Sequence, residues 1–136
     1  MITAVDTSVL IDVFGPETEQ TAVSAESLRG ALTDGVLIAC EVVWAEVAAG
    51  FPEGDVGSAM ERLGVAFSPA TQETALLAGM LWGRHRARGG ARGRLVADFM
   101  IGAHASRQAD RLLTRDRGFY RTYLSDLVVV DPAAAR

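Results

Sequence analysis

Lysine is absent from this chain of 136 residues, and all 13 of its basic side chains are arginine. Chemistry that needs a lysine amine is therefore excluded, including the lysine clamp of P-loop nucleotide-binding proteins and Schiff-base catalysis. Cysteine is almost absent as well. Because Cys40 stands alone, an internal disulfide and a cysteine-based zinc site are both excluded. Apolar neighbours such as Ile38 and Val43 predict a buried thiol rather than a nucleophile.

Long apolar runs are also missing. No run approaches the roughly 20 residues of a membrane-spanning helix, and no basic segment precedes the first apolar stretch as in a secretory signal. These features predict a cytoplasmic protein. Hydrophobic residues nevertheless make up 49% of the chain, which is enough for a core, and no linker-like stretch divides it. We therefore expect one domain over residues 1–136.

The arginines are unevenly distributed. The formal net charge is −4, which would repel nucleic acid if it were spread evenly. No acid occurs between Glu73 and Asp98, however, and this stretch holds a dense run of arginine. Arginine pairs with phosphate and stacks on exposed bases, so the run predicts either an RNA contact or a solvated loop. Its members are Arg84, Arg86, Arg88, Arg92 and Arg94.

Short apolar runs alternate with segments of helical periodicity. Strands are predicted at 2–5, 36–39, 65–67, 111–114 and 127–130. Helices are predicted at 7–14, 17–33, 41–49, 56–63 and 96–108, with a long one that starts at 68–71 and runs toward Arg86. The pattern predicts a three-layer α/β fold, in which a short, mainly parallel sheet is flanked by α-helices. Sites in such folds gather beyond the carboxyl ends of the strands.

Four acids stand where apolar elements end or turn inward. Carboxylates are rare in such surroundings unless they are paired or bind a metal. Four of them brought together would repel one another, and a divalent cation offsets that repulsion. The pattern therefore predicts a metal-dependent enzyme with the candidate ligands Asp6, Glu46, Asp98 and Asp116.

Two of these acids follow predicted strands. Asp6 could cap the next helix or bind a cation, and we favour binding because Thr7 and Ser8 are also good caps. Ser8 would then support a bound water or a neighbouring carboxylate. Asp116 comes just after Thr114, at the end of its strand, where the alternative is a surface ion pair. Six other aspartates fit turns, caps and solvated faces: Asp12, Asp34, Asp55, Asp110, Asp126 and Asp131.

The other two acids interrupt apolar helical segments. The alternative for Glu46 is an exposed helical glutamate, and the alternative for Asp98 is a helix N-cap. Gly102 lies four residues after Asp98, so we expect a small face that metal and substrate can approach. His104 lies about 120° away around this helix and is predicted to be packed or solvated rather than a ligand.

Together these motifs resemble the PIN-domain ribonucleases, and most closely the VapC toxins of prokaryotic toxin–antitoxin pairs. Each motif is weak alone, but the four in this order and at these distances are specific, and they span most of the chain. The segments that carry the resemblance are 5–12, 46–50, 96–105 and 112–119.

The resemblance implies a Mg²⁺- or Mn²⁺-dependent endoribonuclease that hydrolyses RNA phosphodiester bonds. The metal ligands of the family map onto Asp6, Glu46, Asp98 and Asp116. Supporting hydroxyls map onto Ser8 and Thr114, and Arg115 and Arg117 would contact RNA near the scissile bond. One or two cations would generate hydroxide from bound water and stabilise charge on the phosphoryl oxygens.

The resemblance also implies a VapB-type antitoxin laid over an apolar groove, and a homodimer. Trp44, Phe51 and Trp82 are candidate groove residues, although for at least two of them we favour core packing. A catalytically silent PIN-like interaction module is an alternative, although such a module would lack at least one of the four acids. A haloacid dehalogenase-like phosphatase or a response-regulator receiver normally uses lysine, and the former needs aspartate where Ser8 stands, so the sequence counts against both.

Overall fold

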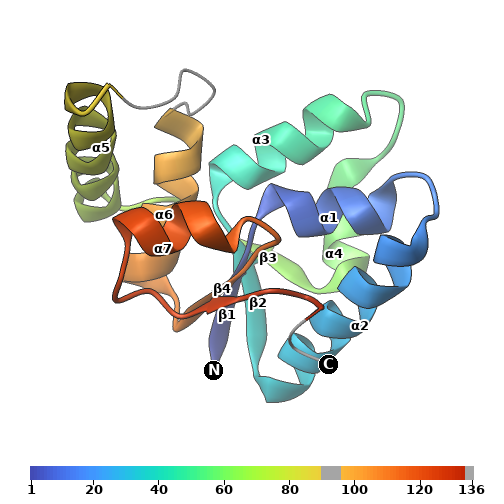
Figure 1. Ribbon diagram of the computed structural model, residues 1–136. Coiled ribbons are helices and arrows are strands. Elements are labelled where there is room, and N and C mark those ends of the chain that lie inside the picture. Colours follow the sequence, from blue (N-terminus) through green and yellow to red (C-terminus); the bar gives the residue numbers. More distant parts are fainter. Residues whose placement is uncertain (90–95, 134–136) are drawn as a thin grey trace.

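The computed structural model describes residues 1–89 and 96–133. A five-stranded sheet with the order β3-β2-β1-β4-β5 forms its centre (Figure 1). All strand pairings of this sheet are parallel, and β1 pairs with both β2 and β4. This arrangement confirms the predicted α/β fold. The strands are β1 (Ile2–Val5), β2 (Val36–Ala39), β3 (Val65–Phe67), β4 (Arg111–Leu113) and β5 (Val129–Val130).

The central strands are mainly apolar, with Thr3 in β1 and Arg111 in β4 as exceptions, and both faces of the sheet are covered. Leu37, Ala39 and Leu112 are fully buried, so no alternation with polar residues is needed. At the edge of the sheet, Phe67 of β3 is exposed. Cys40, directly after β2, is buried as predicted, and burial raises the pKa of its thiol. Burial therefore favours the protonated thiol over the reactive thiolate.

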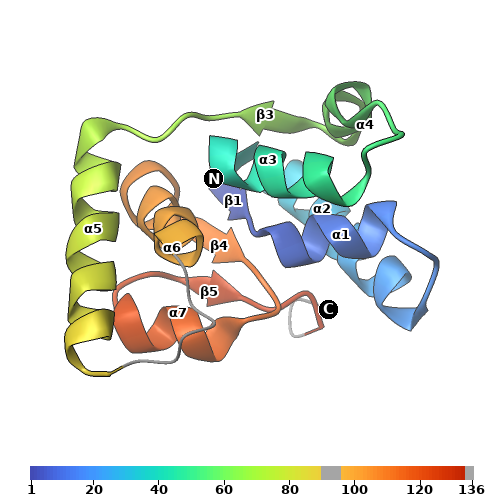
Figure 2. The ribbon, with the colours of Figure 1, turned by 90° about the horizontal axis from the view of Figure 1, so that it is seen from above.

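Seven helices flank the sheet in the described part of the chain. Figure 2 shows α5 as the outermost helix, with α6 between it and the strands. No helix within residues 1–89 and 96–133 has both the length and the apolar character needed to cross a membrane. The helices are α1 (Thr7–Phe14), α2 (Glu19–Asp34), α3 (Glu41–Gly50), α4 (Val56–Leu63), α5 (Gln72–Ala87), α6 (Val96–Gln108) and α7 (Arg117–Tyr123).

Side-chain caps determine where several helices begin. Thr18 accepts a hydrogen bond from the Gln20 amide, so α2 begins at Glu19, two residues later than predicted. Thr71 accepts one from the Thr74 amide in the same way and starts α5. The helices thus begin where a hydroxyl can satisfy the free amides of the first turn.

Helix α7 was not expected from the sequence, and its position corrects one expectation about α6. A Cβ atom added to Gly102 would lie 2.6 Å from Cδ1 of Leu124 and 3.0 Å from Cδ1 of Tyr120. The small face of α6 is thus filled by α7 and the residue that follows it. The expectation that Gly102 leaves space for metal and substrate is therefore wrong, because this glycine permits close packing of two helices.

An aromatic cluster holds α5, α6 and α7 together. Phe99 of α6 is buried at its centre. The centre of its ring lies 5.1 Å from that of Phe119, 5.3 Å from that of Tyr123 and 5.4 Å from that of His85. The Nδ1 atom of His85 also hydrogen-bonds the Tyr123 hydroxyl. Edge-to-face packing of this kind stabilises the group beyond its burial alone.

The start of α5 is fastened to α6 by polar contacts. The Gln108 side-chain oxygen accepts from the Thr71 amide at 3.1 Å and from the Thr74 hydroxyl at 2.8 Å. One turn earlier, His104 is 1% exposed, and its Nε2 lies 3.0 Å from the Ser68 hydroxyl. His104 is therefore packed, as the sequence predicted.

Burial of His104 predicts a loss of stability in mild acid. Burial lowers its pKa below the ordinary 6.5, although the charge of Glu41 and a hydrogen bond with the Ser68 backbone act the other way. The unfolded chain therefore takes up a proton more readily as the pH falls through 6.5. We expect the free energy of unfolding, measured with urea, to decline from pH 7 to pH 5 by at most about 1.4 kcal/mol per pH unit.

The matched variant for this test is His104→Gln, which keeps a group able to bond Ser68 but does not titrate. Its free energy of unfolding should fall less steeply than that of the wild type over the same pH range. Equal slopes for the two proteins would contradict the assignment of the acid sensitivity to His104.

Candidate active site

All strands of the sheet point the same way, so their carboxyl ends lie at one edge. Helices α1, α3 and α6 begin at this edge (Figure 1). Asp6 joins β1 to α1, and Asp116 directly precedes α7. Glu46 lies in α3, and Asp98 lies in the first turn of α6. The four acids are far apart in the sequence, but the parallel topology brings the starts of their elements to the carboxyl edge of the sheet.

Asp6 is held by two hydroxyl groups from different parts of the chain. Its carboxylate is buried, and the Oδ2 atom accepts hydrogen bonds from Thr114 Oγ1 at 2.6 Å and from Ser8 Oγ at 3.1 Å. Thr114 follows β4 and is fully buried, so the first bond joins the ends of two paired strands. Both residues predicted to support the site by a hydroxyl group thus contact the same carboxylate.

The alternative role of Asp6 as a helix cap is not what the structure shows. Asp6 occupies the N-cap position of α1 but makes no side-chain capping bond. Thr7 does not cap the helix either, because its hydroxyl donates to Glu46 Oε1 at 2.7 Å. Hydrogen bonds of the adjacent residues Asp6 and Thr7 therefore connect the start of α1 to the end of β4 and to α3.

The electrostatics of Asp6 favour a nearby cation. Burial raises the pKa of its carboxyl group, and the hydrogen bonds from Thr114, Ser8 and the Thr7 backbone lower it only in part. The negative charge of Glu46 raises this pKa further. The ionised form is therefore costly, and a cation beside it would offset the costs of both desolvation and repulsion.

Asp98 and Asp116 are both half-buried. Asp98 lies inside the first turn of α6, where the helix dipole favours a carboxylate, and not at its N-cap. Asp116 occupies the N-cap position of α7 without a side-chain capping bond. Its backbone amide donates to Thr114 Oγ1 at 3.0 Å, so a single hydroxyl connects Asp116 with Asp6.

The acids do not form a ready-made cage. Within the described residues, no three histidine, cysteine or acidic side chains converge closely enough to hold a metal ion on their own. Mg²⁺, however, commonly binds through one or two carboxylates and keeps several of its waters. The buried Asp6, with Glu46 near enough to raise its pKa, fits a hydrated hard cation in donor type and charge.

The two arginines beside Asp116 form ion pairs within the chain. Arg115 bonds both oxygens of Asp12 at 2.9 Å, and Arg117 Nε lies 3.5 Å from Asp131 Oδ2. The Asp12 side chain is 8% exposed and also accepts from Ser24 at 2.7 Å. Sequence reasoning missed this role, although Asp12 lies one helical turn after Ser8 and hence on the same side of α1.

The other predicted RNA contacts lie at the end of α5. Arg84 and Arg86 belong to its last turn, Arg88 is its C-cap, and all three are exposed. The guanidinium carbon of Arg86 lies 5.2 Å from the centre of the Trp82 ring, a cation–π contact. Arg92 and Arg94 lie outside the described residues.

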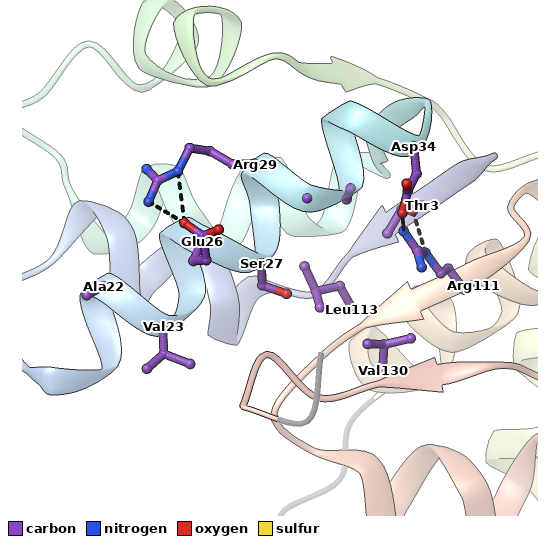
Figure 3. Close-up of a pocket in the computed structure, with 12 residues that line it drawn as sticks. Thr3, Ala22, Val23, Glu26, Ser27, Arg29, Asp34, Arg111, Leu113 and Val130 are labelled. Carbon is purple, nitrogen blue, oxygen red and sulfur yellow. Dashed lines mark hydrogen bonds and ion pairs between the residues drawn. The ribbon is translucent and has the colours of Figure 1, made fainter. Parts of the chain in front are cut away.

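A cavity of about 680 Å³ lies away from the acids. It lies between α2 on one side and β4 and β5 on the other, and none of the four candidate ligands lines it (Figure 3). Ser27 points from α2 toward Leu113 on β4, and the Arg111–Asp34 ion pair closes one end. The cavity is therefore separate from the candidate active site.

Several solved structures share the fold of this chain. A chain of VapBC2 from Rickettsia felis, bound to a DNA fragment from its promoter, matches with a TM-score of 0.74 and 17% identity, covering 96% of this chain and 98% of that one. VapBC-1 from nontypeable Haemophilus influenzae gives 0.70 and 18%, with 97% and 98% covered. Mycobacterium tuberculosis VapC20, a sarcin–ricin loop cleaving toxin, gives 0.56 and 17%, with 81% and 86% covered.

No curated protein matches the sequence. The model of one protein family does, and the family is described as the PIN domain. The match extends over residues 3–124, from β1 to the residue after α7. It includes Asp6, Glu46, Asp98 and Asp116 together with both supporting hydroxyls. The chain therefore belongs to the PIN-domain family.

Proposed function

We propose that this protein is a metal-dependent endoribonuclease and the toxin of a VapBC-type toxin–antitoxin pair. The observation that carries the proposal is the buried Asp6 carboxylate, which Ser8 and Thr114 hold by hydrogen bonds at the carboxyl end of β1. Membership of the PIN-domain family supports a nuclease. The likeness of the fold to VapBC complexes and to VapC20 favours a toxin that cuts RNA.

In this proposal Asp6, Glu46, Asp98 and Asp116 would hold Mg²⁺ or Mn²⁺. A bound cation supplies hydroxide near neutral pH and stabilises charge that develops on the phosphoryl oxygens. The protein contributes orientation. Ser8 and Thr114 fix the Asp6 carboxylate, and Thr7 fixes Glu46, so few side-chain torsions need to be frozen when the substrate binds.

RNA would be bound through arginine. Arg84, Arg86, Arg88, Arg92 and Arg94 are the proposed backbone contacts, and binding through them should weaken with salt. Arg115 and Arg117 lie beside Asp116, and their ion pairs with Asp12 and Asp131 would have to exchange for phosphate. A cellular RNA substrate implies that the protein acts in the cytoplasm, and we propose that residues 1–136 work as one domain.

A VapB-type antitoxin would dock near Trp44. This side chain and Phe67 line an open cavity of about 400 Å³, and their ring centres lie 5.5 Å apart. The indole N–H of Trp44 is buried and has no hydrogen-bond partner among the described residues. An apolar antitoxin segment would fill this cavity and cover both rings. Phe51 packs against Phe14 and is a weaker candidate. We also propose that the toxin forms a homodimer.

The test is cleavage of a pool of cellular RNA by the purified protein. The reaction is run with Mg²⁺, with Mn²⁺ and with EDTA, and the new RNA ends are sequenced. We expect discrete cuts that require metal. Asp98→Asn should cut at least about 10²–10³-fold more slowly, because it removes a charge placed at the reacting phosphate. Asp126→Asn, at an exposed position, is the matched control and should cut at the wild-type rate.

Cuts that persist in EDTA or in Asp98→Asn would contradict the proposed mechanism and indicate a contaminating nuclease. If wild-type protein cuts nothing in the pool, the silent interaction module becomes the better description. In that case the chain should still bind an antitoxin encoded beside it.

A further inference from the structure

The two arginines beside Asp116 form ion pairs of different kinds. Nη2 of Arg115 donates to Oδ1 of Asp12, and Nε lies against Oδ2, both at 2.9 Å. The contact of Arg117 is longer, with Nε 3.5 Å from Oδ2 of Asp131. Two parallel bonds to one carboxylate give arginine a strong and directional pairing. The pair of Arg115 is therefore held in one geometry, whereas that of Arg117 exchanges more readily.

The Asp12 carboxylate is fixed from a second side. Its side chain is 8% exposed, and Oδ2 accepts a hydrogen bond from the Ser24 hydroxyl at 2.7 Å. Ser24 is fully buried in α2, and its hydroxyl accepts in turn from the Gln20 side-chain amide at 3.3 Å. Asp12 belongs to α1, so α1, α2 and the turn before α7 all meet at this carboxylate. A buried network whose members are all bonded rigidifies the elements that it joins.

The turn that Arg115 holds also carries groups of the candidate active site. The Arg115 amide lies 3.4 Å from Oγ of Ser8, and the Ser8 hydroxyl donates to Asp6. The next residue is Asp116, a candidate ligand, whose amide donates to Thr114. Figure 2 shows this turn, between β4 and α7, beside α1. Fixing the Arg115 side chain therefore fixes the backbone between Thr114 and Asp116.

Exchange of Arg115 for a phosphate of RNA is costly in this geometry. It would break both bonds to Asp12 and leave a carboxylate that is almost completely shielded from water without its cation. Arg117 gives up a longer bond, to a carboxylate that is 19% exposed, so its exchange costs less. Of the two arginines beside Asp116, Arg117 is therefore the better RNA contact.

We propose that Asp12 is a positioning residue of the active site and acts through Arg115. The pair holds residues 114–116 against α1 and so keeps Asp116 in place relative to Asp6. Arg115 stays paired while RNA is bound, and the exchange with phosphate described above is confined to the other arginine. This inference rests on the proposed function, because the site that the pair positions is the proposed nuclease site.

Hydrogen exchange of the backbone amides tests the anchor without metal or RNA. Asp12→Asn keeps the shape of the side chain but removes its charge, and Arg115→Met removes the fork. Each should speed exchange of the Asp116 amide at least about tenfold, because the turn opens more often. The measurement is NMR of the protein in EDTA. Asp34→Asn is the matched control, since it breaks the ion pair of Arg111 at the start of β4, and it should leave the Asp116 amide unchanged.

Kinetics separate positioning from RNA binding. The substrate is an RNA that the wild type cuts in the cellular pool. Asp12→Asn and Arg115→Met should each lower kcat about 10–100-fold and leave KM unchanged. The double variant should be no slower than the slower single variant, because both changes break the same pair. Arg115→Lys keeps the charge but not the fork, so it should recover little of the rate.

Ser24→Ala keeps the test decisive if Asp12→Asn folds poorly. It removes the hydroxyl that orients Asp12, and it favours the helix because alanine has the best helix propensity. We expect it to speed exchange of the Asp116 amide and to lower kcat in the same direction as Asp12→Asn, by a smaller factor. Urea unfolding of each variant checks that the compared proteins are folded.

The outcomes separate this inference from the proposed nuclease. Faster exchange at Asp116 in a protein that cuts no RNA supports the anchor and overturns the nuclease. Metal-dependent cutting by Asp12→Asn and Arg115→Met at the wild-type rate, or unchanged exchange at Asp116, overturns the positioning role alone. A raised KM in Arg115→Met that Arg115→Lys restores overturns it in favour of a direct RNA contact.

Discussion

Asp6→Asn is expected to abolish RNA cleavage and, at the same time, to raise the melting temperature of the metal-free protein. The loss of activity follows from removing a charged ligand at the reacting phosphate and should be at least about 10²–10³-fold. The gain in stability follows from burial, which raises the pKa of Asp6 and makes its ionised form costly in the folded chain. The asparagine oxygen can still accept the hydrogen bonds from Ser8 and Thr114.

The size of this stabilisation depends on pH. Because the pKa of Asp6 is higher in the folded chain than the ordinary 3.8, the protonated form stabilises the fold at low pH. That contribution is lost as the pH rises through the folded pKa. The advantage of Asp6→Asn should therefore be largest at neutral pH and should shrink as the pH approaches 4.

Thermal unfolding in EDTA measures this difference. An effect of about 1 kcal/mol corresponds to a shift of roughly 3–5 °C for a domain of this size. Added Mg²⁺ should raise the melting temperature of the wild type more than that of Asp6→Asn, since only the wild type keeps the buried carboxylate. A variant that melts below the wild type at pH 7 in EDTA would contradict the argument.

Thr114→Val is expected to damage the site while leaving every acid in place. The threonine hydroxyl donates to Asp6 Oδ2 at 2.6 Å and accepts from the Asp116 amide at 3.0 Å. Valine has nearly the same shape but can do neither. The half-buried Asp116 amide then loses this hydrogen bond, which costs up to about 1–3 kcal/mol. Asp6 loses a bond that lowers its pKa, and cleavage or metal affinity should fall about 10–100-fold.

Thr114→Ser distinguishes hydrogen bonding from packing, because serine keeps the hydroxyl and lacks the methyl group. We expect it to recover most of the cleavage rate and most of the Mg²⁺ affinity. Thr33→Val removes an exposed hydroxyl in α2 that bonds the Arg29 carbonyl, and it should change neither property. A Thr114→Val protein as active as the wild type would show that Asp6 is positioned without this hydroxyl.

Much of the fold could be predicted because local signals and burial agree. The apolar run at 2–5 forms β1, and the helical pattern at 96–108 forms α6. Helix α7 was missed because it is only seven residues long, contains Gly118 and lacks a side-chain cap, so tertiary packing stabilises it. The last strand is also shorter than the predicted 127–130, since only Val129 and Val130 pair with β4.

The candidate site shows the same limit. Its acids could be named from the sequence because a carboxylate in an apolar segment is unusual. The contacts of these acids could not be predicted, since the hydrogen bond from Thr7 to Glu46 depends on how α1 and α3 pack. The role of Asp12 was missed because its partner Arg115 is 103 residues away. Whether the four acids bind metal together stays a prediction that the experiments above test.

The hydrogen bond between Asp6 and Thr114 spans 108 residues and has a consequence for biosynthesis. The ribosome makes the N-terminus first, at about 5–20 residues per second. Until β4 has left the ribosome, β1 lacks one of its two neighbouring strands. Asp6 then also lacks the hydrogen bond from Thr114. The proposed nuclease would therefore be incomplete until the last part of the chain emerges. A cell that makes such a toxin would be shielded from it during translation, and an antitoxin made at the same time could be waiting when the fold closes.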